Sequence, residues 1–427
     1  MSTLGRYDMM WRLARPFLPL LLRRRAAAGK EDRTRIAERF GQLGDRSDLP
    51  QNPVWIHAVS VGESVAAMAL AGSIRDRDAG LPILITTNTV TAAARVAAQA
   101  TRIGLTHLYQ PLDHPDMVAA FLRHVQPRLA LFLESDFWPN LVIRTAESGV
   151  PVAFVSAQLS DRAFARWQKQ QVIATRLFGS ASLVLAVDDV QAEYFIALGA
   201  DKKKVRVGGS LKLPGPRRPI NADFVSMLKK AAGSRSVLLA ASTHEGEDET
   251  VIEAAKQLGE KWFTIIAPRH PERGADIAAL AMSQGLIAQR RGSGAAAQEG
   301  DPLYIADTLG EMDSLFSVAD VVFLGGSLEP LGGHNPVEPA AHGLPILTGP
   351  HVFKNTAEFA GLQAAGVVTE IVTATELATS SRDIVANRQT RRNIAAAGRH
   401  YAAETGKRPQ IAADSCLALI GTSTAPS

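Results

Sequence analysis

Ten short apolar segments, arranged in two sets of five, constrain the fold of this chain more than any other feature. They lie at residues 54–60, 82–87, 129–134, 151–156 and 183–187, and at 237–241, 262–267, 303–305, 321–324 and 345–347. Continuous runs of Val, Ile and Leu are typical of strands buried on both faces of a parallel sheet. Alanine-rich stretches such as 64–74 separate them and have helical composition. The pattern predicts an α/β protein with two doubly wound domains that face a cleft.

A proline-rich segment at 213–219 marks the predicted domain boundary, because closely spaced prolines form a stiff connector. A chain of 427 residues has room for two domains. We therefore expect a basic segment at 1–40, a first Rossmann-like domain at 41–213 and a second at 214–427. The small, polar tail from Gly421 is predicted to be disordered.

The cysteine and histidine content narrows the class of protein. Cys416 is the one cysteine, which excludes an internal disulfide and favours a reducing compartment. The ten histidines show no H-E-x-x-H spacing, so no metal site is predicted. No internal repeat is visible, and no nucleic-acid partner is predicted.

The first 40 residues are basic and contain an apolar stretch. They carry ten Lys or Arg against four Asp or Glu, whereas the whole chain has a net charge of +4. The longest apolar run, 16–22, is far shorter than the roughly 20 residues of a spanning helix. Trp11, Phe17 and the leucines at 20–22 beside arginines predict a segment that lies on an anionic membrane surface. A basic helix packed on the first domain is an equally good interpretation.

The stretch 325–343 is the most informative local motif, because a glycine-rich loop follows the buried strand at 321–324. Glycines allow backbone to approach a ligand closely. The motif Asn335-Pro336-Val337-Glu338 predicts a helix start, with Asn335 as N-cap and Glu338 three residues later. Free N–H groups and the helix dipole would favour the phosphate of a sugar nucleotide. Taken alone, Asn335 and Glu338 are more often an ordinary capping box, but the density of glycine, histidine and proline exceeds what a cap requires.

Acidic residues follow two of the first five predicted strands. Glu63 ends the motif 57–63 (HAVSVGE), where it is placed either as a general base or as the capping partner of Ser60. Glu134 and Asp136 follow the strand at 129–133, and a carboxylate at the end of an apolar strand requires compensation. Lys212 could supply positive charge to a leaving phosphate.

Two further segments of the second domain could contact a nucleotide. Pro268 and Arg269 follow the strand at 262–267, and an arginine can bind a phosphate through two hydrogen bonds. Leu309, Gly310 and Glu311 precede a predicted helix, whose N–H groups could also meet the nucleotide.

These motifs together resemble the bacterial transferases of 3-deoxy-D-manno-octulosonic acid (Kdo). The matching stretches occur in the family's order, at 57–63, 86–91, 134–140, 209–212, 242–247, 268–273, 307–311, 325–342 and 349–351. The resemblance implies a GT-B fold and transfer of Kdo from CMP-Kdo to a lipid A precursor (lipid IVA), with inversion and without a metal or cofactor. It also implies a location on the cytoplasmic face of the bacterial inner membrane.

The resemblance assigns roles to the candidate residues. Glu63 is implied as the base that deprotonates the acceptor, and Glu134 and Lys212 as stabilisers of the transition state. The implied contacts to CMP are Pro268, Arg269, Leu309, Gly310, Glu311, Asn335, Pro336, Val337 and Glu338.

The chain departs from the family pattern in two places. Asp136 stands where many members have a glutamate, and residues 9–22 are less continuously hydrophobic than in many members. Alternative interpretations are another GT-B sugar-nucleotide enzyme such as an epimerase, a non-catalytic lipid A- or nucleotide-binding protein, and a membrane-surface scaffold.

Overall fold

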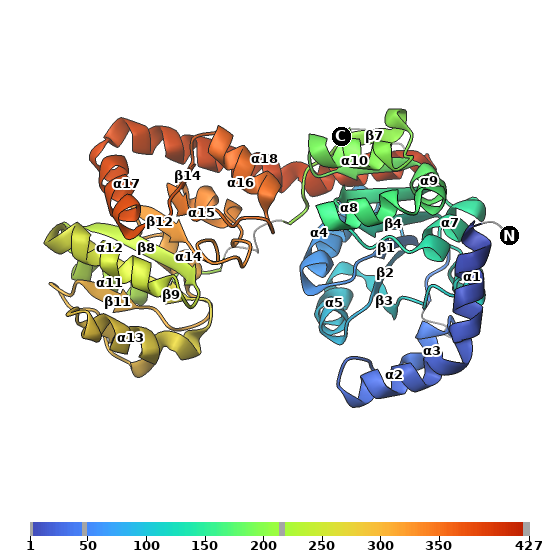
Figure 1. Ribbon diagram of the computed structural model, residues 1–427, viewed down its shortest axis with the longest axis horizontal. Helices are drawn as coiled ribbons and strands as arrows, with labels where there is room; N and C mark the ends of the chain where they lie inside the picture. Colours follow the sequence, from blue (N-terminus) through green and yellow to red (C-terminus); the bar gives the residue numbers. More distant parts are fainter. Residues whose placement is uncertain (1–2, 45–48, 213–217, 422–427) are drawn as a thin grey trace. The chain divides into compact units, whose positions relative to one another are not determined.

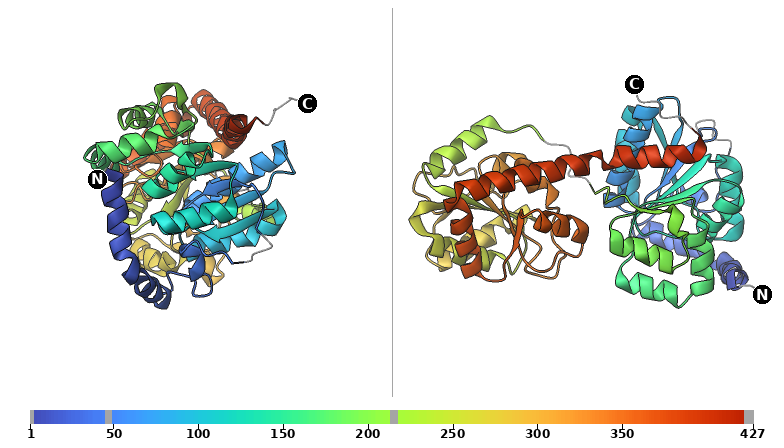
Figure 2. Two further views of the ribbon diagram at one scale, coloured as in Figure 1. Left: turned by 90° about the vertical axis from the view of Figure 1, so that its right-hand side faces the viewer. Right: turned by 90° about the horizontal axis from the view of Figure 1, so that it is seen from above.

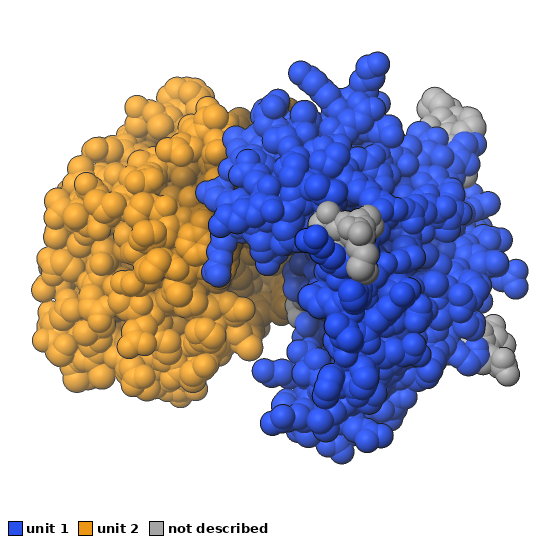
Figure 3. All heavy atoms as spheres, turned by 45° about the vertical axis from the view of Figure 1, so that its right-hand side comes forward, with its two compact units in different colours: residues 1–213, 405–427 blue, residues 214–404 orange. Residues whose placement is uncertain are grey.

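The computed structural model describes residues 3–44, 49–212 and 218–421, which form two compact units (Figure 3). Unit 1 comprises Met1–Leu213 and Thr405–Ser427, and unit 2 comprises Pro214–Glu404. Most of the predicted connector and almost all of the predicted disordered tail lie outside the described residues. Each unit contains one parallel sheet with helices, which confirms the predicted α/β class (Figure 1).

The sheet of unit 1 has the order β3-β2-β1-β4-β5-β6-β7, and every neighbouring pair is parallel. Its strands are β1 (Val54–His57), β2 (Ile83–Thr87), β3 (Leu105–Tyr109), β4 (Leu129–Leu133), β5 (Val152–Ala157), β6 (Leu183–Ala186) and β7 (Val205–Val207). The strand order reverses between β1 and β4. We call this place of reversal the switch point. A doubly wound sheet binds its ligand there, at the carboxyl ends of the strands.

The sheet of unit 2 has the order β10-β11-β9-β8-β12-β13-β14 and is also parallel throughout. Its strands are β8 (Ser236–Thr243), β9 (Trp262–Pro268), β10 (Ala288–Arg290), β11 (Leu303–Ile305), β12 (Val321–Leu324), β13 (Ile346–Thr348) and β14 (Val368–Glu370). Here the strand order reverses between β8 and β12.

All ten predicted strands are present, and the four that the sequence did not reveal are the edge strands β3, β7, β10 and β14. An edge strand has a neighbour on one side alone, so its sequence is freer to include polar residues. Three of the four have only three residues and read VRV, AQR and VTE. Such segments lack the apolar run on which the prediction depended.

Helices connect the strands of both sheets (Figure 1). The helices of unit 1 before the connector are α1 (Thr3–Ala14), α2 (Leu18–Ala27), α3 (Ile36–Arg39), α4 (Val61–Arg77), α5 (Val90–Ile103), α6 (Pro115–Val125), α7 (Pro139–Glu147), α8 (Asp161–Gln168), α9 (Gln171–Gly179) and α10 (Asp189–Ala197). The helices that follow are α11 (Ala222–Ala232), α12 (Asp248–Leu258), α13 (Gly274–Ser283), α14 (Met312–Phe316), α15 (Val337–His342), α16 (Thr356–Ala364), α17 (Ala374–Ala386) and α18 (Arg388–Leu417). Short 3₁₀ turns occur at Arg15–Phe17, Lys202–Lys204, Gly259–Lys261, Pro271–Arg273, Arg291–Ser293 and Ala418–Ile420.

The central strand β1 shows how the sequence builds two cores. Alternate side chains of a strand point to opposite faces, so Val54 and Ile56 join one hydrophobic cluster and Trp55 joins the other. Trp55 is fully buried, with ring centroids 4.9 Å from Phe121 and 5.3 Å from Phe132. Burial on both faces explains why β1 has no polar residue before His57.

The end of the chain corrects the predicted domain limits. Residues 405–427 belong to unit 1, not to the predicted second domain at 214–427. The reason is packing: α18 leaves unit 2 and places Ala412, Ala413, Cys416 and Leu417 in the same core cluster as Val54 (Figure 2). Helical periodicity alone does not say which core a helix joins.

The N-terminal helices pack on unit 1 and also expose apolar side chains. The Tyr7 hydroxyl donates to Asp113 (2.7 Å), and Arg144 pairs with Asp8 (2.7 Å). The packed-helix interpretation is therefore correct for α1. The opposite side of these helices presents exposed apolar side chains, called the apolar patch below: Met9, Met10, Leu13, Phe17, Leu20 and Leu21.

Candidate active site

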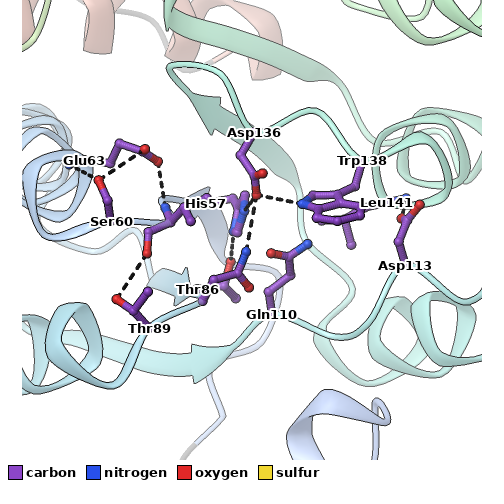
Figure 4. A network of polar contacts seen from close by, with 12 residues as sticks. His57, Ser60, Glu63, Thr86, Thr89, Gln110, Asp113, Asp136, Trp138 and Leu141 are labelled. Atoms are coloured by element: carbon purple, nitrogen blue, oxygen red, sulfur yellow. Dashed lines mark hydrogen bonds and ion pairs between the residues drawn. The ribbon is translucent and has the colours of Figure 1, made fainter. Parts of the chain in front are cut away.

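Glu63 lies in the first turn of α4, directly after the central strand of unit 1 (Figure 4). The Glu63 N–H donates to Ser60 Oγ (3.3 Å), and the Val59 N–H donates to Glu63 Oε2 (2.7 Å). Ser60 Oγ also donates to Glu63 Oε1 (3.2 Å). The carboxylate therefore does take part in capping α4, as one of the two interpretations expected.

The surroundings of Glu63 make its carboxylate more basic than usual. The residue is 8% exposed, and burial is the largest cause of a raised pKa. The negative charges of Glu134 and Asp136 raise this pKa further. The Val59 N–H and His57 lower it, but by less than burial raises it. A carboxylate with a raised pKa at a switch point has the properties of a general base.

Glu134 follows β4 on the other side of the switch point, in a strained conformation. Its φ is +55°, in the left-handed region that non-glycine residues rarely adopt. Glu134 Oε2 accepts from Gln158 Nε2 (3.1 Å) and pairs with Lys212 Nζ (3.1 Å). Glu134 Oε1 is buried and has no hydrogen-bond partner among the described residues. Strain and an unsatisfied buried oxygen make Glu134 a candidate for a functional role.

Lys212 reaches Glu134 although it follows the edge strand β7. The Gly208 N–H donates to the Ala186 carbonyl (2.8 Å), and the Leu211 N–H donates to Ser156 Oγ (3.1 Å). These bonds lead the segment back across the carboxyl ends of β6 and β5. Two of the three predicted catalytic residues, Glu134 and Lys212, are thus in direct contact.

Asp136 forms a partly buried hydrogen-bond network with His57, which the sequence did not single out. His57 is fully buried, with Nε2 2.9 Å from Asp136 Oδ2 and Nδ1 2.8 Å from Thr86 Oγ1 (Figure 4). Trp138 Nε1 donates to the same Asp136 oxygen (2.8 Å). The shorter carboxylate is therefore held in place by defined partners. The one available signal was the polar His57 at the end of an otherwise apolar strand.

The glycine-rich loop of unit 2 differs from its prediction as an open anion site. Its N–H groups at Gly326, Ser327 and Leu328 donate to the carboxylate of Glu247 (2.7, 2.9 and 3.0 Å). The His244 N–H donates to Glu247 as well (2.9 Å). Glu247 is fully buried, and its carboxylate engages N–H groups that the prediction left open to a ligand. An internal carboxylate, not the ligand, therefore organises this loop.

The helix after the loop begins later than predicted. Helix α15 starts at Val337, and its N-cap is Pro336 instead of Asn335, without a side-chain capping bond. The predicted N-cap at Asn335 therefore lies one residue before the observed one. Asn335 still orders the turn, since its Oδ1 accepts from the Val337 N–H (3.0 Å). Glu338 lies in the first turn of α15.

The remaining predicted nucleotide contacts follow neighbouring strands. Pro268 ends β9, and the Arg269 N–H donates to the Thr243 carbonyl (3.0 Å). Leu309 and Gly310 come after β11 and are followed by Glu311, which precedes α14. Because β11, β9, β8 and β12 are adjacent and parallel, these segments and the loop to α15 share one edge of the sheet.

Glu311 is already engaged by neighbouring side chains. Arg291 donates to both of its oxygens (2.9 and 3.2 Å), and Thr308 donates to one of them. Burial alone would raise the pKa of Glu311, but these hydrogen bonds outweigh it and the pKa is lowered. Glu311 is therefore a carboxylate whose charge holds the turn that precedes α14.

The sequence profile of the family described as 3-deoxy-D-manno-octulosonic-acid transferase (kdotransferase) matches residues 34–214. A curated relative, the 3-deoxy-D-manno-octulosonic acid transferase of Haemophilus influenzae, is 32% identical over 371 residues. The matched region covers 86% of this chain and 87% of the relative. The chain belongs to this family. The resemblance seen in the sequence motifs is thereby confirmed, and the protein is a member of a glycosyltransferase family.

Solved structures confirm the GT-B fold. A glycosyltransferase from Rickettsia africae matches with a TM-score of 0.60 and 13% identity, covering 87% of this chain and all of that one. The UDP-GlcNAc 2-epimerase of Neisseria meningitidis matches with a TM-score of 0.57 and 12% identity, covering 86% and 100%. At such low identity the likeness shows the fold alone. The sequence relationship, not the fold, separates this chain from the epimerases.

Proposed function

We propose that this protein transfers Kdo from CMP-Kdo to a lipid A precursor (lipid IVA), with inversion at the anomeric carbon. The observation that carries the proposal is the buried Glu63, with its raised pKa, across the switch point from the Glu134–Lys212 pair. A base and a positively charged partner at one switch point are what proton removal and charge stabilisation require. The family relationship supports the identity of the transferred sugar.

In this proposal each group of unit 1 has a defined chemical step. Glu63 takes the proton of the acceptor hydroxyl, whose oxygen attacks the anomeric carbon of Kdo. The bond from that carbon to the phosphate oxygen breaks, and CMP leaves with the electron pair. Lys212, oriented by Glu134, stabilises the negative charge that develops. Attack opposite the leaving group inverts the anomeric centre.

Unit 2 binds the donor in this proposal. The contacts to CMP come from the segments at the carboxyl edge of the second sheet, namely Pro268, Arg269, Leu309, Gly310, Glu311, Asn335, Pro336, Val337 and Glu338. The leaving group carries one phosphate, so basic side chains and N–H groups can balance its change of charge without a metal ion or cofactor. CMP-Kdo is a substrate.

The decisive experiment is incubation of the protein with CMP-Kdo and tetra-acylated lipid A precursor, followed by mass spectrometry of the lipid. We expect mass increments that correspond to one or more Kdo units, formed equally well in the presence of a chelator. An unchanged lipid mass would contradict the proposed activity. Complete inhibition by the chelator, with activity otherwise present, would contradict the metal-free reaction alone.

A membrane partner is proposed from the apolar patch. Phe17 and Leu13 are 70% and 71% exposed, and arginines lie beside them in α1 and α2. No helix within the described residues is long and apolar enough to span a bilayer. We infer that the patch inserts into the anionic cytoplasmic surface of the bacterial inner membrane, where the acceptor lipid resides.

Replacing Leu13, Phe17, Leu20 and Leu21 by glutamine should release the protein from anionic vesicles. Even partial insertion contributes roughly 1 kcal/mol for each side chain, so we expect binding to weaken about 100-fold or more. Flotation with phosphatidylglycerol vesicles measures this loss. A control with Val172→Gln and Val190→Gln, two exposed apolar residues elsewhere on unit 1, should bind normally. Unchanged binding of the four-residue variant would rule out the patch as the anchor.

A further inference from the structure

Two histidines share a hydrogen bond at the switch point of unit 2. His244 follows β8, and His334 lies in the loop between β12 and α15. Their Nε2 atoms are 3.0 Å apart, and the ring planes are within 12° of parallel. Gly326 allows this approach: at φ +70°, a Cβ there would lie 3.2 Å from His334 Cδ2 and 3.5 Å from His244 Cδ2.

The short distance fixes the number of protons that the pair can hold. A hydrogen bond between two Nε2 atoms requires one proton between them. When the pair is neutral, each ring carries one proton: the donor ring has it on Nε2 and keeps a bare Nδ1, and the acceptor ring has it on Nδ1. One further proton on that bare Nδ1 keeps the Nε2 bond intact, whereas a second would place protons on both Nε2 atoms and break it. The pair can accept one proton and no more.

Burial and the surrounding charges both favour the neutral form of the pair while no ligand is present. His334 faces positive or titratable groups at Arg269, Lys354 and His270, and its pKa is lowered to about 4, mainly by burial. Burial also lowers the pKa of His244, with Arg273, Arg269 and His270 adding to this effect. Glu247 acts in the opposite direction on His244, but its carboxylate is engaged by four N–H groups.

We propose that the His244–His334 pair is part of an anion subsite and takes up one proton when the phosphate monoester of a nucleotide binds. A bound phosphate supplies negative charge, which offsets the surrounding cations and favours the protonated pair. Protonation then gives the pair a second Nδ1–H group. This inference rests on the proposed function, because it takes CMP as the nucleotide, and it adds two histidines that the motifs did not assign.

Isothermal titration calorimetry of the full-length protein with CMP tests the proton uptake. At pH 8 the phosphate of CMP is already a dianion, since its second pKa is roughly 6, so uptake reports on the protein. Titrations in buffers of different ionisation enthalpy should give a net uptake of protons, at most one for each CMP bound. Cytidine, which lacks the phosphate, should bind without uptake.

Variants identify the acceptor of the proton. His334→Gln and His244→Gln each keep a polar side chain that does not titrate, and should abolish the uptake and weaken CMP binding about ten-fold. His400, an exposed histidine on α18, provides the matched control, and His400→Gln should behave as the unmodified protein. Uptake that persists in both pair variants would overturn the inference.

A measurement without variants covers the case in which these substitutions prevent folding. Proton uptake requires CMP affinity to fall as the pH rises above neutrality, by at most ten-fold for each pH unit, while cytidine affinity stays level. CMP binding with a flat pH dependence and no uptake would overturn the inference and leave the proposed function standing. Failure of the protein to bind CMP at all would overturn the proposed donor, and the inference with it.

Discussion

Replacing Glu63 by glutamine is expected to lower the single-turnover rate of Kdo transfer by roughly 10²–10⁴-fold, the usual contribution of a positioned base. The amide oxygen of glutamine can still accept the hydrogen bond that the Val59 N–H now gives to Glu63 (2.7 Å). It cannot accept the proton of an acceptor hydroxyl. Ser60 remains the N-cap of α4, so the melting temperature should change little.

A second capping glutamate provides a matched control. Glu376 accepts from the Val372 N–H (2.7 Å) and forms a capping box with Thr373 at the start of α17. Like Glu63 it stands three residues after the N-cap, but it is exposed, lies in unit 2 and is outside every proposed contact. Glu376→Gln should cost about 1 kcal/mol of stability at most and leave transfer unchanged. If Glu63→Gln gives this same pattern, Glu63 is a cap and the base is Glu134 or Asp136.

The pH profile provides an independent readout of the same prediction. Because burial raises the pKa of Glu63, the carboxylate gains its basic form above the ordinary value of 4.5. The rate of transfer should therefore rise with pH through a pKa higher than 4.5, as Glu63 loses its proton. This rise of the rate with pH should be absent from the residual activity of Glu63→Gln. If the rise is identical in both proteins, the group that titrates is not Glu63.

Replacing Lys212 by methionine is expected to slow transfer by roughly 10²–10³-fold, because one charged stabiliser of the transition state is removed. Methionine retains most of the apolar stem. The Lys212 side chain is 30% exposed and that of Glu134 is 7% exposed, so the variant leaves a nearly buried carboxylate without its cation. Rapid-quench measurement of a single turnover separates this effect from product release.

A double-mutant cycle and a matched pair support the assignment of Lys212. Glu134→Gln and Lys212→Met should not be additive, because the two side chains act as one unit. The Lys256–Glu253 pair on α12 has a similar separation of 3.2 Å but is exposed. Lys256→Met should therefore leave transfer unchanged. Full additivity of the first two variants would mean that Glu134 does not orient Lys212.

The fold was predictable where burial dictates composition. Strands β1, β4, β8 and β12 flank the switch points, are covered on both faces and therefore show continuous apolar runs. The same apolar runs also indicated where these strands end. Glu63 and Glu134 could therefore be identified from the sequence as candidate site residues. The edge strands need not be apolar on both faces. Because their sequences contain polar residues, they could not be recognised from the sequence.

The candidate site was less predictable, because its contacts join residues that are distant in the chain. Glu247 accepts from the N–H groups of a loop 79 to 81 residues later, and local sequence gives no sign of this pairing. The contact between His244 and His334 spans 90 residues. A glycine-rich motif indicates that the loop backbone makes a close contact. The tertiary structure determines whether the contacting group is a ligand or another side chain of the protein.

The return of α18 to unit 1 has a consequence for synthesis on the ribosome. The core face formed by Val54 and Ile56 is completed by Ala412, Ala413, Cys416 and Leu417, which emerge last. Unit 2 can fold while the nascent first unit still exposes an apolar surface of the kind that chaperones bind. A chain terminated shortly before residue 412 would therefore carry a complete unit 2 and an unfinished unit 1. Premature termination would in this way disable the half of the enzyme that was made first.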